Sequence, residues 1–252
     1  MNHKKKVSAV ILAAGKGTRM KSEKPKVAVE LNGKPMIGYV IESLQSSGIE
    51  DIVVVVGYKK EDVMDICKIY DGIRFVEQKE QLGTAHALMC AEELLGDLEG
   101  TVLVAAGDAP LITSESFSSL QNFHHDNNLD ITILSANLDN ATGYGRILRN
   151  TQGHVSGIVE EKDATDDQKK ITEINTGTYC FSSPAVFDHL KKIGNSNAQK
   201  EYYLPDLVEI YNNEKLPVGA LVLANSFESH GINSQEELAR IAAMMQDGKL
   251  PV

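Results

Sequence analysis

The sequence predicts an α/β protein built on a doubly wound, mostly parallel sheet. Apolar runs of strand length recur through the first half of the chain, and segments with helical periodicity lie between them. This alternation is typical of parallel strands that are joined by crossover helices. The expected strands are residues 7–14, 52–56, 73–76, 101–106 and 131–135.

Each helix expected between these strands has one apolar face. Residues three or four positions apart lie on the same side of a helix, so apolar residues at this spacing indicate the side that packs against the sheet. The strands and helices together predict a core over residues 1–139. The expected apolar faces are formed by Met36, Val40, Ile41 and Leu44, by Val63, Ile66 and Ile69, and by Ala87, Leu88, Ala91, Leu94 and Leu95.

From about residue 140 the strand-like runs become shorter and less regular. Further strands are expected at residues 146–149, 155–159, 174–181 and 218–223, with helices beginning near Pro184 and within residues 203–212. We therefore expect a smaller mixed β lobe over residues 140–225, above the cleft at the carboxyl ends of the parallel strands. Residues 226–252 would then supply a loop and a final amphipathic helix, and residues 1–252 are interpreted as a single domain. This helix is expected from Gln235 to Met245, and its apolar side is expected to be formed by Leu238, Ile241, Ala242 and Met245.

The composition of the chain argues against nucleic acid and membrane as binding partners. The net charge of −10 disfavours nucleic acid, which is usually bound through an extended basic face. No stretch approaches the roughly 18 apolar residues of a membrane span. The basic N-terminus followed by an apolar run resembles a secretory signal, but the run leads directly into a glycine-rich loop, so we interpret it as a buried strand. A cytoplasmic protein is expected, and nothing in the sequence predicts self-association.

The loop after the first strand has the residues of an anion-binding turn. Gly15 and Gly17 allow the backbone to approach a phosphate closely, and Arg19 and Lys26 add positive charge nearby. The spacing matches neither the P-loop nor the dinucleotide-binding fingerprint. The alternative is an ordinary strand-to-helix turn with solvated basic residues.

Asp108 directly follows the expected strand at residues 101–106. Ligands of doubly wound sheets lie at this edge, and a carboxylate there suits a hard cation such as Mg²⁺. The alternative is a turn or N-cap role before Pro110.

The loop at residues 12–20, LAAGKGTRM, resembles the corresponding loop of the nucleotidyltransferases that activate sugar 1-phosphates. The similarity continues in order along nearly the whole chain. Within that family the chain is similar to the uridylyltransferase domain of the bacterial N-acetylglucosamine-1-phosphate uridylyltransferases. The further segments are QLGTAH at residues 81–86, GDAPL at 107–111, TGYGR at 142–146, IVEEKDA at 158–164, EINTG at 173–177 and NAQKEYY at 197–203.

The resemblance implies a Rossmann-like nucleotidyltransferase fold and a role for each matching residue. It implies Arg19 and Lys26 as the catalytic residues, and Asp108 with Asn233 as the Mg²⁺ ligands. The sugar 1-phosphate would contact Gly145, Glu160, Asn175 and Thr176, and the nucleotide would contact Leu12, Ala13, Ala14, Gly15, Gly17, Thr18, Gln78, Gly83, Thr84 and Gly107.

By the same resemblance the chain transfers UMP from UTP to N-acetylglucosamine 1-phosphate and releases pyrophosphate. The alternatives are a uridylyl- or thymidylyltransferase acting on glucose 1-phosphate, or a catalytically silent nucleotide-sugar-binding subunit. The family often has an aromatic residue at the position of Ala106 and a glutamate at that of His230. The enzymes resembled usually also carry a left-handed β-helix that acetylates glucosamine 1-phosphate. Its repeats are not found in this sequence, so acetyltransferase activity is not expected.

Overall fold

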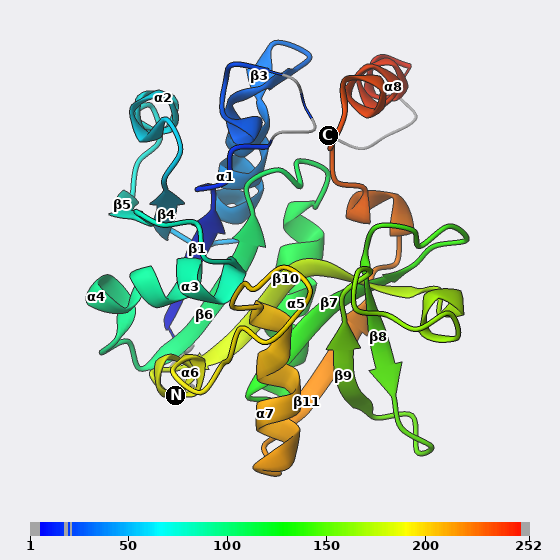
Figure 1. Cartoon of the computed structure of the whole chain (residues 1–252). Helices are drawn as coiled ribbons and strands as arrows, with labels where there is room; N and C mark the ends of the chain where they lie inside the picture. The colour runs from blue at the N-terminus through cyan, green and yellow to red at the C-terminus, as the bar shows by residue number, and fades with distance from the viewer. Residues whose placement is uncertain (1–5, 18–19, 21, 248–252) are drawn as a thin grey trace.

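The computed structural model describes residues 6–17, 20 and 22–247 of the 252-residue chain. Its main feature is a nine-stranded sheet whose principal path is β11-β7-β10-β6-β1-β4-β5 (Figure 1). The first five strands of the chain in this sheet are β1 (Lys6–Leu12), β4 (Asp51–Val56), β5 (Ile73–Glu77), β6 (Gly100–Ala106) and β7 (Ile131–Asn137). Each of them covers or overlaps an expected strand, and the predicted α/β class is confirmed.

The centre of the sheet explains why its strands read as continuous apolar runs. β1 is paired in parallel with β4 on one side and with β6 on the other. Helices cover both faces of the sheet, so residues that point to either face are buried. Ala9, Val10 and Ile11 accordingly have no exposed surface.

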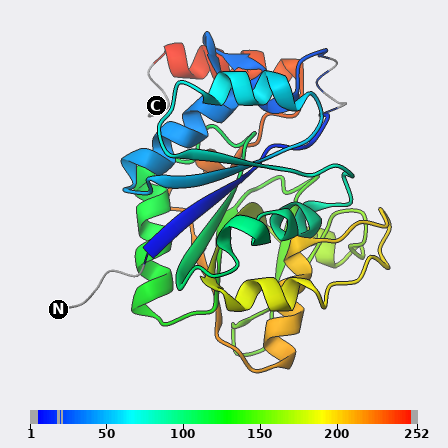
Figure 2. The same cartoon turned by 90° about the vertical axis from the view of Figure 1, so that its left-hand side faces the viewer.

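Helices form a layer on each face of the sheet (Figure 2). On one face α1 (Met36–Ser46), α2 (Lys60–Cys67) and α5 (Ser114–Asp126) pack on the sheet through one hydrophobic cluster. On the other face a second cluster involves α3, α4, α6 and α7. The bounds of these helices are Thr84–Cys90, Glu92–Leu95, Ala185–Leu190 and Leu207–Asn213.

The expected helical faces needed two corrections. Residues 87–95 form two short helices, α3 and α4, which meet at Ala91 rather than forming one. Ile69 lies beyond the end of α2 and is 80% exposed, so it is not part of the apolar face. Helix α5 was not predicted, because its buried side includes only Phe117, Leu120 and the polar His124.

The strands after residue 140 are distributed differently from expectation. β8 (Gly145–Arg149) and β9 (Val155–Val159) form a hairpin that branches from the main sheet. β10 (Glu173–Ser183) instead lies within the sheet, antiparallel to both β6 and β7, and β11 (Val218–Val222) extends the edge next to β7. A β-bulge between Asn175 and Thr178 divides β10, so that its first half pairs with β8 and its second half with β6.

A third hydrophobic cluster holds the C-terminal helix. α8 (Gln235–Gln246) packs near the hairpin of β2 (Glu30–Leu31) and β3 (Lys34–Pro35) and the start of α1. Leu238, Ile241, Ala242 and Met245 contribute to this contact, which confirms the predicted apolar face. Among the described residues, no helix has both the length and the apolar character needed to cross a bilayer.

Candidate active site

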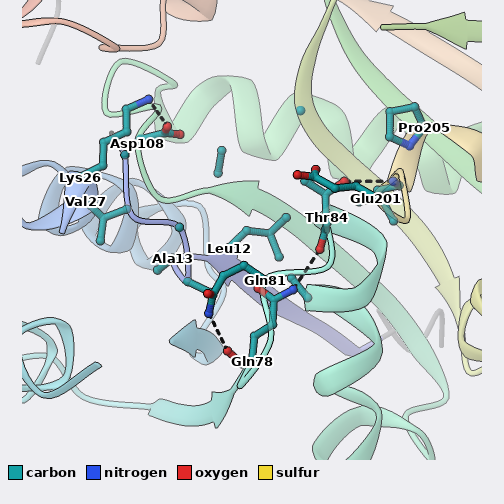
Figure 3. A pocket seen from close by; sticks show the side chains of 18 of the residues that line it. Leu12, Ala13, Lys26, Val27, Gln78, Gln81, Thr84, Asp108, Glu201 and Pro205 are labelled. Atoms are coloured by element: carbon teal, nitrogen blue, oxygen red, sulfur yellow. Dashed lines mark hydrogen bonds and ion pairs between the residues drawn. The ribbon is translucent and has the colours of Figure 1, made fainter. Parts of the chain in front are cut away.

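A cavity of about 470 Å³ opens at the carboxyl ends of β1 and β6. Residues from all parts of the chain meet there (Figure 3). Lys26 and Asp108 face one another on one side, whereas Gln78, Gln81 and Thr84 form another wall. The predicted residues that line the cavity are Leu12, Ala13, Ala14, Gly15, Gly17, Lys26, Gln78, Gly83, Thr84, Asp108, Glu160, Asn175 and Asn233.

The glycine-rich turn is held against neighbouring strands by backbone hydrogen bonds. The Ala13 amide donates to Val55 O at 3.0 Å, and the Tyr58 amide donates to Ala14 O at 3.1 Å. Gly17 adopts φ +65°, a backbone conformation that residues other than glycine rarely adopt. A Cβ atom at Gly17 would also overlap the Cβ of Lys26. The turn therefore requires glycine in order to approach Lys26.

Lys26 is the centre of the charged end of the cavity. Its Nζ forms an ion pair with the Asp108 carboxylate and donates to Asn233 Oδ1 at 2.6 Å. The lysine side chain is 11% exposed, so solvent screens these interactions only partly. Side-chain oxygens from two segments that are far apart in the chain thus converge on one cation.

The position of Asn233 follows from the cap of α8. Ser234 is the N-cap and accepts from the Glu237 amide, while the Glu237 carboxylate accepts from the Ser234 and Asn233 amides. This reciprocal capping box determines where the helix begins. Glu228 anchors the preceding segment to α5, because its carboxylate accepts from both the amide and the hydroxyl of Thr113 at 3.0 Å. Asn233 is therefore held just outside the helix, facing Lys26.

At the other wall, Gln78 stabilises the turn that begins α3. Its Nε2 donates to Gly83 O at 3.0 Å and lies 3.1 Å from His86 Nδ1. Gly83 has φ +113°, and a Cβ there would overlap the backbone of Tyr202. The Thr84 hydroxyl accepts from the Leu204 amide at 3.0 Å. The segment from Glu201 to Pro205 is thereby fixed against this turn and closes one side of the cavity.

Glu160 and Asn175 lie at a further part of the lining, supplied by the β8–β9 hairpin and by β10. Burial raises the pKa of the Glu160 carboxyl, and the nearby Asp163 and Asp206 carboxylates raise it further. The hairpin is held by the fully buried Arg146, whose guanidinium lies 2.7 Å from the Glu161 carboxylate. Glu160 lies between the end of β9 and this ion pair.

Three other predicted residues, Gly107, Gly145 and Thr176, are not part of the cavity lining. Gly107 is inside the fold, where its amide donates to Leu12 O at 3.0 Å and links the ends of β6 and β1. Gly145 allows Glu160 to approach, because a Cβ there would lie 3.0 Å from Glu160 Oε1. The Thr176 hydroxyl donates to Leu134 O at 2.7 Å. Thr18 and Arg19 lie outside the described residues.

Several lining residues were not predicted as site residues. Gln81 and Ala106 belong to or adjoin motifs identified in the sequence, so their proximity to other site residues could have been found. Gly177 and Glu201 also lie in such motifs, EINTG and NAQKEYY. Tyr179, Leu204 and Pro205 lie in none of these motifs, and they reach the cavity through strand pairing and loop packing. The additional residues are Val27, Gln81, Ala87, Ala106, Gly177, Tyr179, Glu201, Leu204 and Pro205.

Asp206 has a carboxyl group whose pKa is strongly raised. It lines a second cavity, of about 350 Å³, which Glu160 also lines. Burial, followed by the charges of Glu209 and Asp163, raises the pKa of Asp206 from 3.8 to about 6. The ionised form therefore destabilises the folded state at pH values above about 6. As the pH falls from 6 toward 3.8, this destabilisation is lost because the folded protein takes up a proton before the unfolded chain does.

The Asp206→Asn variant is expected to be more stable than the wild type at pH 7.5, by about 1–2 kcal/mol after allowance for partial solvent screening. The gain should diminish as the pH approaches 4. Thermal unfolding measured across this pH range tests the prediction. Asp167→Asn is the matched control, since Asp167 is an exposed carboxylate paired with Lys170. A gain that did not change with pH would contradict the assignment to Asp206 ionisation.

The charged end of the cavity is compatible with a metal that takes only a few protein ligands. Within the described ranges, no group of three or more His, Cys, Asp and Glu side chains could hold a metal ion. Mg²⁺ is commonly held by one or two protein oxygens together with phosphate oxygens and water. The oxygens of Asp108 and Asn233, which already surround the Lys26 ammonium, are of this type.

The chain is similar to proteins of known family over most of its length. Residues 8–226 match the nucleotidyl transferase family. The chain is 48% identical over 97% of its length to the Bifunctional protein GlmU of Syntrophomonas wolfei subsp. wolfei, and 46% identical over 96% to that of Alkaliphilus metalliredigens. It covers 54% and 52% of these relatives, so the chain spans about half of their length.

Solved structures share the fold at lower sequence identity. A UDP-glucose pyrophosphorylase complexed with UDP-glucose has a TM-score of 0.77 at 18% identity, covering 97% of this chain and 99% of that one. A putative glucose-1-phosphate thymidylyltransferase from Bacillus anthracis has a TM-score of 0.76 at 20% identity, covering 96% of both chains. Members of nucleotidyltransferase families usually use a divalent metal. With the family match over residues 8–226, these findings show that the chain belongs to the nucleotidyl transferase family.

Proposed function

We propose that this chain transfers UMP from UTP to N-acetylglucosamine 1-phosphate, forming UDP-N-acetylglucosamine and pyrophosphate. The main support is a single cavity that joins Lys26, Asp108 and Asn233 to Glu160 and Asn175. It thereby combines a site for charge neutralisation with amide and carboxylate groups suited to sugar hydroxyls. The relatives named Bifunctional protein GlmU, at 43–48% identity, support the choice of substrates.

The proposed reaction is a direct in-line displacement. A phosphate oxygen of the sugar 1-phosphate attacks the α-phosphorus of UTP, a new O–P bond forms, and the bond to the β-phosphate breaks so that pyrophosphate leaves with the electron pair. Such a transfer depends mainly on positioning and on stabilisation of charge. Lys26, Arg19 and the amides of the glycine-rich turn are proposed to supply that stabilisation.

Asp108 and Asn233 are the proposed Mg²⁺ ligands. Their oxygens already converge on the Lys26 ammonium, so they present the hard donors that the ion prefers. When bound, Mg²⁺ would neutralise charge on the phosphates.

Gln78 supports recognition of a base that has a donor at N3. Its Nε2 donates to Gly83 O and lies 3.1 Å from His86 Nδ1, and we propose that Oε1 is the atom that accepts from the base. The N3–H of uracil is a donor, whereas N3 of cytosine is an acceptor. This arrangement favours UTP over CTP as the nucleotide substrate.

Three consecutive segments of the chain are proposed to have separate roles. Residues 1–139 would bind the nucleotide, residues 140–225 the sugar phosphate, and residues 226–252 would supply Asn233 and the helix that supports it. This division accounts for the two ends of the cavity, because Gln78 and Gly83 come from the first segment and Glu160 and Asn175 from the second.

The function is tested by measuring pyrophosphate release and the nucleotide-sugar product. UTP, dTTP and CTP would each be combined with N-acetylglucosamine 1-phosphate, glucosamine 1-phosphate and glucose 1-phosphate. We expect the highest kcat/KM with UTP and N-acetylglucosamine 1-phosphate. Preferential turnover of glucose 1-phosphate, or nucleotide binding without pyrophosphate release, would contradict the proposal.

Substitution of Gly17 tests the geometry of the turn. Gly17→Ala should lower kcat about 10- to 100-fold, because the added methyl group displaces Lys26 and a misplaced catalytic group is costly. Gly153→Ala is the control, since Gly153 also has a positive φ (+83°) but its Cβ would meet no atom within 4 Å. Steady-state kinetics and thermal unfolding of both variants separate the two effects. Equal activity of the two variants would show that the close approach to Lys26 is unimportant.

A further inference from the structure

We propose that Tyr179 is a positioning residue for the sugar phosphate, acting by holding the side-chain amide of Asn175 in one orientation. This inference rests on the proposed function and extends it to a residue that no motif identified. Both side chains line the same cavity, and both come from β10.

The amide of Asn175 is held at both ends. Its Nδ2 donates to Tyr179 Oη at 2.6 Å, and its Oδ1 accepts from the Gly177 amide at 3.1 Å. Rotation of the amide by 180° would place Nδ2 against the Gly177 N–H, so that two donors would face each other. Tyr179 and Gly177 therefore specify the same orientation, and Asn175, which is 8% exposed, can present one N–H and one lone pair to a ligand.

The β-bulge makes this interaction possible. Between Asn175 and Thr178 the register of β10 against β7 shifts, and Gly177 has φ +79°. The irregularity turns Asn175 and Tyr179, four residues apart, toward a shared hydrogen bond. Bulges commonly redirect side chains in this way.

Tyr179 is itself rigid. Its backbone pairs with Val104 of β6 and Ile133 of β7, and its ring stacks on Phe181 with centroids 5.5 Å apart. The side chain is 2% exposed. Burial and the Glu160 carboxylate raise the pKa of Tyr179 above its ordinary value, so the phenol keeps its proton. The hydroxyl can thus accept from Asn175 while its own proton remains available as a donor.

The Tyr179→Phe variant keeps the ring and removes the hydroxyl that Asn175 uses. We expect the KM for N-acetylglucosamine 1-phosphate to rise about 5- to 20-fold, as loss of one buried hydrogen-bond partner implies, with the KM for UTP changed less than about twofold. Tyr211→Phe is the matched control. Tyr211 is also buried, and its hydroxyl has no hydrogen-bond partner among the described residues, but it lies outside the cavity.

A double-mutant cycle distinguishes positioning from a general structural effect. If Tyr179 acts through Asn175, then Tyr179→Phe should change the KM for the sugar phosphate by less than about twofold in an Asn175→Ala background. Additive effects, or equal KM values for Tyr179→Phe and Tyr211→Phe, would overturn the inference. Absence of wild-type turnover with these substrates would instead refute the proposed function, and with it this role, so the two failures are distinguishable.

Discussion

Lys26→Ala is expected to lower kcat by about 10²–10³-fold while the fold is retained, because preorganised charge stabilisation is lost at the reacting phosphates. The structure gives two reasons for a large effect. The Nζ lies at the meeting point of Asp108 and Asn233, and its side chain is 11% exposed, so water replaces the ammonium poorly. Removing it also leaves the Asp108 carboxylate without its paired cation. Steady-state kinetics with UTP and N-acetylglucosamine 1-phosphate, together with a thermal unfolding curve, provide the measurement.

Lys24→Ala is the matched control for this variant. Lys24 is two residues away and carries the same charge, but it pairs with Glu30 at 3.0 Å, and its side chain is 59% exposed. An exposed ion pair of this kind usually contributes less than about 1 kcal/mol. We therefore expect near-normal kinetics for Lys24→Ala. Similar activity losses in both variants would indicate a general effect of charge and refute a specific role for Lys26.

The second large effect is expected at Asp108. Asp108→Asn preserves the size of the side chain but removes its charge, so it should weaken Mg²⁺ binding and lower kcat by about 10²–10³-fold. The Mg²⁺ concentration needed for half-maximal activity should also rise. Titration of activity with Mg²⁺ measures both quantities in the variant and in the wild type.

Two controls complete this experiment. One is removal of the metal, and the other is substitution of an exposed carboxylate. Activity of the wild type should be lost in EDTA and restored by excess Mg²⁺. Asp65→Asn should leave the Mg²⁺ titration unchanged, because Asp65 is 69% exposed and pairs with Lys68 on the surface. If Asp108→Asn instead retains the wild-type titration curve, Asp108 is not a metal ligand.

Much of this protein could be predicted from local sequence. The parallel strands at the centre of the sheet are uninterrupted apolar runs because helices cover both of their faces, and this burial is encoded residue by residue. The glycine-rich turn was also recognisable from local sequence, because its backbone needs glycine. Gly17 has a positive φ that few other residues adopt. The start of α8 also followed from nearby residues, because Ser234 and Glu237 cap each other.

Other features depend on contacts between residues far apart in the chain. The position of β10 between β6 and β7 could not be predicted, since the apolar residues of a strand do not specify which strands will be its neighbours. Helix α5 was missed because most of its thirteen residues are polar, and its small buried side becomes evident only against the sheet. The importance of Tyr179 likewise depends on a bulge whose register is set by β7.

The sequence by itself determined the α/β class, the glycine-rich turn and most of the residue types in the candidate site, because backbone preferences and burial patterns act over a few neighbouring residues. Only the tertiary structure decided that Asn233 would meet Lys26, which is 207 positions away, and that Tyr179 would hold Asn175. Those contacts arise when the strands pair into the sheet and α8 packs near α1. Strand pairing and loop closure join distant segments, and neither is specified by any short stretch of the chain.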